Sequence, residues 1–340
     1  MIWLTWRQFR FSALTVFGVL GAVALALAHT GPRLSREYAD LRAACGGASC
    51  HPEAFEDFFF SHLGVYLGLN ALVIAVPAVV GVFWGAPLIS REFETGTQDL
   101  VWQQSVPRRR WLAVKLGLVG LAAIAAAGLA VAAVSWWSRP FDATTIDGAG
   151  RMSPVLFDAR GYAVLGRAAF AFALGAAAGL LIRRTVPAMA VTFAVVVAVQ
   201  IVMPTMVRPH LATPARLETV ITANNLNGVE ASGPGGTVRG LQAGIGPPGA
   251  WILTNETVDS AGRTVDTLPA WVSDCTTPEA PSGEITQQQC LQRLAAAGYR
   301  QVVTYHPADR FWPFQAYETA IFGMLSLLLA GFCFLRIRPS

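Results

Sequence analysis

The densest charge of the chain lies in one short segment, residues 91–111, which reads REFETGTQDLVWQQSVPRRRW. It holds four arginines and three acids, with Lys115 just beyond, although only 14% of the 340 residues are charged. Arginines at a membrane surface can bind lipid phosphates, and charges of both signs can pair with a protein partner. Which of these roles applies depends on the side of a membrane that the segment faces.

Catalytic and cofactor chemistry has little support in this sequence. No Ser/His/Asp or paired-carboxylate motif stands out, and His306 and Asp309 are interpreted as structural. The chain has a single lysine, Lys115, and no G-x-x-x-x-G-K-[ST] phosphate loop, so it is not a P-loop ATPase. His51 directly follows Cys50, but the other histidines show no metal-ligand spacing. We therefore expect no cofactor and no metal in this chain, and a net charge of +4 does not by itself suggest nucleic acid.

Six apolar stretches are long enough to cross a bilayer, which takes about 20 helical residues. Hydrophobic residues make up 54% of the chain, and its 14% of charged residues compares with about 25% in soluble domains. The sequence therefore predicts an all-α polytopic membrane protein with six transmembrane helices. The predicted spans are approximately 11–28, 64–87, 111–137, 161–182, 186–207 and 314–335.

The basic residues predict the orientation of these spans. With the N-terminus inside, the inner segments hold 11 Lys and Arg in 46 positions, whereas the outer segments hold 13 in 165. Cytoplasmic connections of membrane proteins are enriched in Lys and Arg. We therefore expect both termini and the charged segment in the cytoplasm.

The four cysteines of the predicted outer loops fall into two local pairs, Cys45 with Cys50 and Cys275 with Cys290. An oxidising exterior makes disulfides the first interpretation of such pairs. Cys333 lies within the sixth span and is expected to stay free.

The remaining organisation follows from composition. Residues 1–10 predict a short helix on the inner membrane surface, and 11–206 hold spans one to five. Residues 207–313 predict a small irregular α+β domain outside the membrane, with a helix in EITQQQCLQRLAAAGYR and a strand in QVVTY. Residues 314–340 hold the sixth span and a cytoplasmic tail. Three G-x-x-x-G pairs, Gly64/Gly68, Gly81/Gly85 and Gly175/Gly179, are interpreted as helix packing within one subunit.

The charged segment also predicts a helix of its own. Thr95 and Gln98 fit a capping box, and Pro107 prevents continuation of a helix that runs from about 96 to 105. Leu100, Val101 and Gln104 would lie on one face of that helix. A loop that served only topology would explain the arginines but not the acids, the glycine-threonine pair or the capped helix.

The order of these residues resembles the coupling-helix segment of type-2 ABC exporter permeases, of an actinobacterial-like kind. In that family the segment, here 91–110, lies between the second and third spans and docks into a groove of an ATPase. The resemblance covers about two-thirds of the chain, and the large outer domain departs from it. The matching residues are Glu92, Glu94, Gly96, Thr97, Pro107, Arg109 and Lys115, and Leu100 and Val101 are added as the docking face.

The resemblance implies an export permease in the bacterial plasma membrane, with residues 1–10 as the elbow helix. It implies a separate ABC ATP-binding subunit that carries ATP and Mg²⁺, and a second permease copy, most simply an identical one. Two alternatives stay open: an ion-coupled secondary transporter, and a sensor or assembly protein that acts through its outer domain. The transported substrate is not implied.

Overall fold

The computed structural model describes residues 2–44, 52–96, 107–142, 150–222, 225–231, 237–244, 246–272 and 287–337. It divides into two compact units. The membrane unit comprises Met1–Thr144, Pro154–Leu211 and Phe311–Ser340. The strand unit comprises Thr145–Ser153 and Ala212–Arg310.

The membrane unit is built from long apolar helices, and each of the six predicted spans lies in one of them. Six helical stretches among the described residues are long and apolar enough to cross a membrane. Their elements are α1 (Ile2–Ala44), α2 (Pro52–Val80) continued through a π-helical turn (Gly81–Gly85) into α3 (Ala86–Thr95), α5 (Arg108–Trp137), α8 (Ala163–Ile182), α9 (Thr185–Val202) and α12 (Phe311–Arg336). The chain is therefore a multi-pass membrane protein by length and composition.

The first two helices extend beyond the predicted spans. The separate surface helix predicted at 1–10 is instead the beginning of α1, which runs without a break to Ala44. Much of the connection predicted at 29–63 is also helical, because α2 already begins at Pro52. The stretch RLSREYADLRAA at 33–44 contains good helix formers and forms an exposed helix, although its polar composition is equally compatible with a loop.

Helix α8 is the centre of the membrane unit, and α2, α3, α5, α9 and α12 all contact it. Its sequence is mostly alanine and glycine, which allows neighbouring backbones to approach closely, and most of its side chains are buried. The helix α1 packs chiefly against α5. Few side chains in the apolar windows of α1, α9 and α12 are fully buried, as expected for helices that face lipid or a second subunit.

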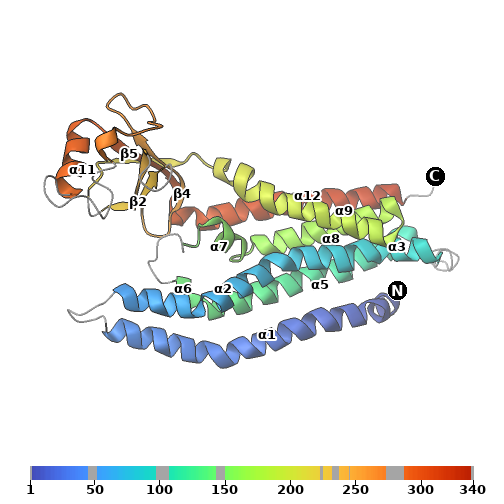
Figure 1. The fold of residues 1–340 in the computed structure, drawn as a ribbon. Coiled ribbons are helices and arrows are strands. Elements are labelled where there is room, and N and C mark those ends of the chain that lie inside the picture. The colour runs from blue at the N-terminus through green and yellow to red at the C-terminus, as the bar shows by residue number, and fades with distance from the viewer. Residues whose placement is uncertain are drawn as a thin grey trace. The chain divides into compact units, whose positions relative to one another are not determined.

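The beginning of α1 and the end of α12 lie at the end of the membrane unit that α3 occupies, here called the α3 end (Figure 1). Near the N-terminus, the Phe9 ring lies edge-on to Trp84 at 4.7 Å between centroids. Near the C-terminus, Ile337 packs in one cluster with Ile89 and Trp111. The short helices α6 (Arg139–Asp142) and α7 (Pro154–Asp158) lie at the opposite end of the unit, the α7 end.

The strand unit is a small α+β fold. Its antiparallel sheet has the order β1 (Ala215–Thr219), β5 (Arg300–His306), β4 (Trp251–Val258), and β2 (Leu226–Ala231) pairs with β3 (Val238–Ala243). Helix α11 (Gln287–Ala296) buries Leu291 and Leu294 against Leu241. The predicted strand lies in β5 and the predicted helix in α11, and Gly298 beyond the helix has the positive φ of 86° expected at a helix end.

The predicted disulfides can be tested chemically. Cys45, Cys50 and Cys275 lie outside the described residues, Cys290 is buried in α11, and Cys333 is a buried free thiol in α12. We expect Cys45–Cys50 and Cys275–Cys290 as linked peptides in a non-reducing digest, because both pairs are predicted to face an oxidising exterior. Mass spectrometry of alkylated, unreduced protein measures this, and recovery of these four cysteines as free thiols would contradict it.

Candidate functional site

The predicted coupling segment begins at the end of α3. This helix ends at Gly96, whose positive φ of 68° lets its N–H bond to the Glu92 carbonyl. Thr95 is the last residue of α3, and its hydroxyl donates to the Arg91 carbonyl at 2.8 Å. Gly96 is therefore the cap of α3 and not the first residue of the helix predicted at 96–105. The rest of that predicted helix, with Thr97, Leu100 and Val101, lies outside the described residues. Its capping box therefore stays a prediction.

After this gap the chain resumes at Pro107 and enters α5. Pro107 precedes the first helical residue, where its missing N–H costs no hydrogen bond, and its carbonyl accepts from the N–H groups of Arg110 and Trp111. Arg109 and Arg110 are exposed in the first turn. The segment thus enters from one helix of the bundle and leaves through another.

Glu92 is not available to an outside partner, because it forms a buried ion pair with Lys115. Its carboxylate accepts from Lys115 Nζ, and the two side chains are only 9% and 4% exposed. Lys115 also donates to the Leu88 carbonyl at 3.4 Å and lies 4.9 Å from the Trp111 ring centroid. The pair joins α3 to α5.

Glu94 joins α3 to a third helix. Its Oε2 accepts from the backbone N–H of Thr185 at 3.1 Å and from the Thr185 hydroxyl at 2.6 Å. Thr185 is the first residue of α9, so an exposed carboxylate lies at the positive end of that helix. The Ser90 hydroxyl also reaches the Thr185 hydroxyl at 3.2 Å. Glu94 therefore braces α3 against α9.

Close contacts between glycines and neighbouring backbone atoms pack the junction of α2 and α3 against α8. A Cβ on Gly175 would lie 2.3 Å from the Gly81 carbonyl oxygen, and one on Gly85 would lie 2.5 Å from the Phe172 carbonyl oxygen. A Cβ on Gly179 would likewise lie 2.5 Å from the Ala86 carbonyl oxygen. Two of the predicted G-x-x-x-G pairs thus face each other within one subunit. A Cβ on Gly64 or Gly68 would meet nothing within 4 Å, so the third pair makes no such contact.

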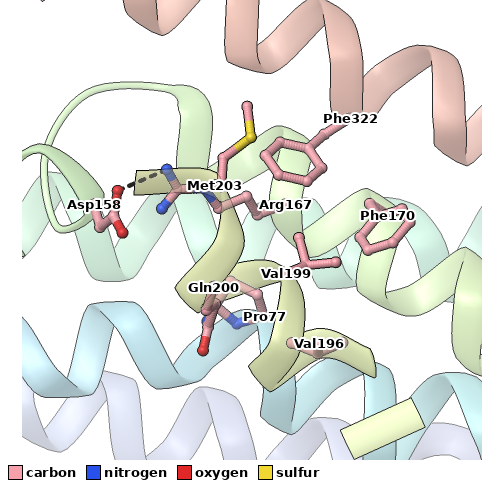
Figure 2. A pocket seen from close by; sticks show the side chains of 9 residues that line it. All are labelled: Pro77, Asp158, Arg167, Phe170, Val196, Val199, Gln200, Met203 and Phe322. Carbon is pink, nitrogen blue, oxygen red and sulfur yellow. Dashed lines mark hydrogen bonds and ion pairs between the residues drawn. The ribbon is translucent and has the colours of Figure 1, made fainter. Parts of the chain in front are cut away.

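A second polar site lies toward the α7 end, where a small cavity opens between the spans. The volume within which the centre of a water molecule can lie is about 10 Å³. The cavity therefore has room for about one water. Asp158 and Arg167 are its charged lining residues, and Arg167 Nη2 donates to Asp158 Oδ1 at 2.7 Å (Figure 2). The other lining residues are Pro77, Phe170, Val196, Val199, Gln200, Met203 and Phe322.

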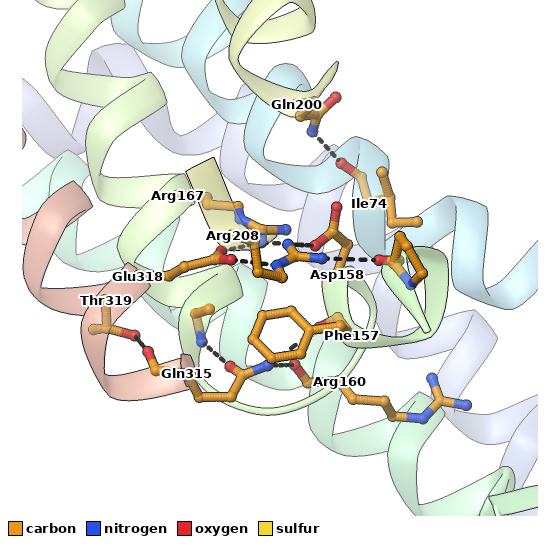
Figure 3. A network of polar contacts seen from close by, with 12 residues as sticks. Ile74, Phe157, Asp158, Arg160, Arg167, Gln200, Arg208, Gln315, Glu318 and Thr319 are labelled. Atoms are coloured by element: carbon orange, nitrogen blue, oxygen red, sulfur yellow. Dashed lines mark hydrogen bonds and ion pairs between the residues drawn. The ribbon is translucent and has the colours of Figure 1, made fainter. Parts of the chain in front are cut away.

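These two charges belong to a closed ring of four, here called the charge ring: Asp158, Arg167, Glu318 and Arg208 (Figure 3). Each arginine binds both carboxylates. Arg208 donates from Nε to Glu318 Oε1 at 2.6 Å and from Nη2 to Asp158 Oδ1, and Arg167 Nη2 also donates to Glu318 Oε2. The ring joins α7, α8, α12 and the 3₁₀ turn Arg208–His210 that follows α9.

All four side chains of the charge ring are taken out of solvent. Arg208 and Glu318 are fully buried, whereas Arg167 and Asp158 are 7% and 9% exposed. Each charge has partners of opposite sign, which burial in an apolar bundle requires. The Arg208 guanidinium also lies 4.1 Å from the Phe157 ring centroid.

Further polar contacts hold the loop after α7 in place. The Gln315 side chain on α12 donates to the carbonyls of Phe157 and Arg160 and accepts from the Ala163 N–H at 2.7 Å. Gly161 has a positive φ of 70°, and a Cβ there would lie 2.6 Å from the Gln315 side chain. Arg160 donates in turn to Asn70 on α2 at 2.6 Å. This loop therefore ties α12 to α2.

The sequence pointed to only part of the charge ring. Arg167, Gln200 and Glu318 stand out as polar residues within predicted spans, but Asp158 and Arg208 fall in predicted connections. One sequence signal could have indicated the ring: single charges of both signs occur near those ends of neighbouring spans that are predicted to lie on the same side of the membrane. Among the described residues, no group of three His, Cys, Asp or Glu side chains could hold a metal ion.

Comparison with known proteins places these features in a family. No curated protein and no solved structure matches the chain significantly. A family model described as ABC-2 membrane transporter related matches residues 17–208, which is more than half of the chain and includes α3, α5, α8 and α9. The chain therefore belongs to the ABC-2 membrane transporter related family and is a membrane transport component.

Proposed function

We propose that the chain is the permease subunit of an ATP-driven ABC exporter, and that a separate ATP-binding subunit hydrolyses the ATP. Membership of the ABC-2 family supports this, and so does the lack of a phosphate loop in the sequence. ATP and Mg²⁺ are then bound by the partner and not by this chain.

The bracing of segment 91–110 is the observation that carries the proposal. Helix α3, in which the segment begins, is joined to α5 through Glu92 and Lys115 and to α9 through Glu94 and Thr185. Glycine contacts join it to α8. A loop that only set topology would need none of these contacts. A force applied to the segment by an ATPase can reach three spans through short, specific links.

The same proposal includes the orientation of the chain in the membrane and its assembly with a second copy. The beginning of α1, the end of α12 and helix α3, in which segment 91–110 begins, share one end of the membrane unit. We place this end in the cytoplasm on the basis of the basic residues. The strand unit is then extracytoplasmic. Two identical copies in a bacterial plasma membrane would form the transport path, and the exposed faces of α1, α9 and α12 are available for lipid or for the second copy.

Variants can separate docking from transmission. We expect Leu100→Asp to weaken co-purification of the ATP-binding subunit, because it places a charge on the predicted docking face. We expect Glu94→Ala to retain the ATPase but to uncouple hydrolysis from its regulation by the permease. The physical reason is loss of the brace on α9, because the Glu94 carboxylate no longer accepts from the N–H and hydroxyl of Thr185 at the beginning of that helix.

Thr185→Val is the matched variant, because it removes the hydroxyl that binds Glu94 and leaves segment 91–110 intact. It should reproduce part of the Glu94→Ala effect on permease-stimulated ATP hydrolysis. Arg216→Ala, in an exposed pair with Glu218 of the strand unit, should change neither quantity. If Glu94→Ala loses the ATPase while Thr185→Val is silent, then Glu94 acts by direct contact and the transmission role is wrong.

The buried charge ring favours one second candidate, an ion-coupled secondary transporter, because such transporters carry ionisable residues inside their spans. The ring contains two positive and two negative groups that are fully paired with one another. An ion gradient without ATP should drive uptake or efflux by the purified chain in vesicles if this candidate is correct. The ABC proposal expects no such flux without the ATP-binding subunit.

A further inference from the structure

The charge ring lies where the membrane unit connects to the strand unit along the chain. The chain leaves the membrane unit after Leu211 and re-enters it at Phe311 and at Pro154. Arg208, Glu318 and Asp158 each lie within eight residues of one of these three points. The ring therefore fastens the three connections to one another and to Arg167 of α8.

The backbone at Arg208 is not α-helical. After α9 the chain forms a π-helical turn over Met203–Val207 and then a 3₁₀ turn over Arg208–His210. The Arg208 N–H bonds to the Met203 carbonyl, five residues earlier, instead of to the carbonyl four residues earlier. Pro204 and Pro209 lack the N–H groups that a regular α-helix would use here. Single π-helical turns of this kind recur at functional sites.

This turn gives Arg208 two possible positions. A π-helical turn accommodates one more residue than an α-helical turn. If the turn relaxed to α-helix, the residues beyond it would rotate by about 100°, the angle that one residue spans in an α-helix. Such a rotation would carry the Arg208 side chain away from Glu318 and Asp158 and open the ring beside the cavity.

We propose that the charge ring is a closed gate at the outer end of the permease, and that the π-helical turn Met203–Val207 is its hinge. The inference deepens the proposed export function and rests on it, since α9 carries the Glu94 brace at Thr185 and the ring residue Arg208 follows its other end. Movement of α3 reaches the gate through α9. Opening exposes the cavity that Met203 and Gln200 line.

Burial of the four charges costs desolvation free energy, and a bundle with one fixed arrangement has no need of such a buried ring. An apolar set of side chains of similar volume is often as stable as a buried ion-pair network, or more stable. Buried ionic groups are best attested as devices that choose between arrangements. In the closed ring, each positive charge is paired with negative charges, and these ion pairs hold the helices together. In an open ring, the separated charges can bind water instead.

The test measures how fast a gate residue reacts. Met203 is 5% exposed and lines the cavity, so a Met203→Cys variant reports opening through its labelling by a membrane-impermeant maleimide added from outside. The parent chain with Met203 intact corrects for native thiols. With the ring intact and no ATP, we expect slow labelling.

Two comparisons decide the matter. In the isolated permease, adding Glu318→Gln should raise the labelling rate about tenfold, the change that about 1.4 kcal/mol produces in an equilibrium. The control Asp142→Asn neutralises another buried carboxylate, paired with Arg160 and outside the ring, and should leave the rate unchanged. In the complex with the ATP-binding subunit, turnover of ATP should raise the rate in the intact ring as well.

Each failure has a separate meaning. If no ATP-binding subunit associates, the proposed function is wrong, and the Glu318→Gln arm still tests the ring as a closure. If the subunit associates and hydrolyses ATP but labelling stays at the ATP-free rate, the gate is wrong and the ring is a static support. If Glu318→Gln and Asp142→Asn raise labelling equally, the effect is general loosening and the gate is likewise overturned.

Discussion

A leucine in place of Gly175 is expected to prevent normal folding of the membrane unit. The Cβ alone would lie 2.3 Å from the Gly81 carbonyl oxygen and 2.7 Å from the Ala86 N, and both of these atoms belong to the backbone. Side-chain rotation cannot relieve such a clash, so α8 must separate from the α2–α3 junction. Overpacking of a core usually costs about 1–3 kcal/mol, and a backbone clash at the centre of the bundle should reach or exceed that range.

The measurement is the yield of monodisperse protein in mild detergent together with its midpoint of thermal unfolding. Gly117→Leu is the matched control, because a Cβ on Gly117 of α5 would meet nothing within 4 Å. The control should resemble the parent protein. Equal stability of the two variants would show that α8 does not pack against the α2–α3 junction in this way.

The second large effect concerns the charge ring. Arg208→Met leaves Asp158 and Glu318 with Arg167 as their shared cation, inside an apolar bundle. Removing one partner of a buried ion pair typically costs about 3–5 kcal/mol. We therefore expect a strong fall in the midpoint of thermal unfolding for Arg208→Met.

Adding Glu318→Gln to Arg208→Met should recover much of this loss, since Asp158 and Arg167 remain as a balanced pair. An exposed arginine gives the control: Arg216→Met breaks only a surface pair with Glu218, which is worth about 0–1 kcal/mol. A double variant that is less stable than Arg208→Met alone would contradict the ring as a set of mutually compensating charges.

The spans were predictable because burial in lipid leaves a direct signal, a long apolar run that ends near tryptophans. The helical extension of α1 to Ala44 was not, because charged residues such as Arg36 and Glu37 fit an exposed helix and a loop equally well. The pairing of Gly81 with Gly175 could be suspected from spacing, but the partner helix could not be identified. Helix order along the chain does not fix which faces meet.

The partners of the polar residues were also beyond sequence reasoning. Glu92 and Lys115 are 23 residues apart, and Arg167 and Glu318 are 151 apart. Only the fold brings them together. The resemblance at 91–110 identified Glu92 and Glu94 as important, yet their observed contacts are with Lys115 and Thr185 of the same chain. The motif therefore drew attention to these residues without revealing whether they face a partner or brace the bundle.

The central claim is that this chain works with a separate ATP-binding subunit docked on segment 91–110. The most direct measurement is mass spectrometry of the proteins that co-purify with the tagged chain in mild detergent, compared between the parent protein and Leu100→Asp. We predict that the parent retains a P-loop ATPase whose hydrolysis of ATP depends on the permease, and that Leu100→Asp loses it while inserting normally. Purification of the folded parent chain with no ATPase, or equal retention by Leu100→Asp, would contradict the account.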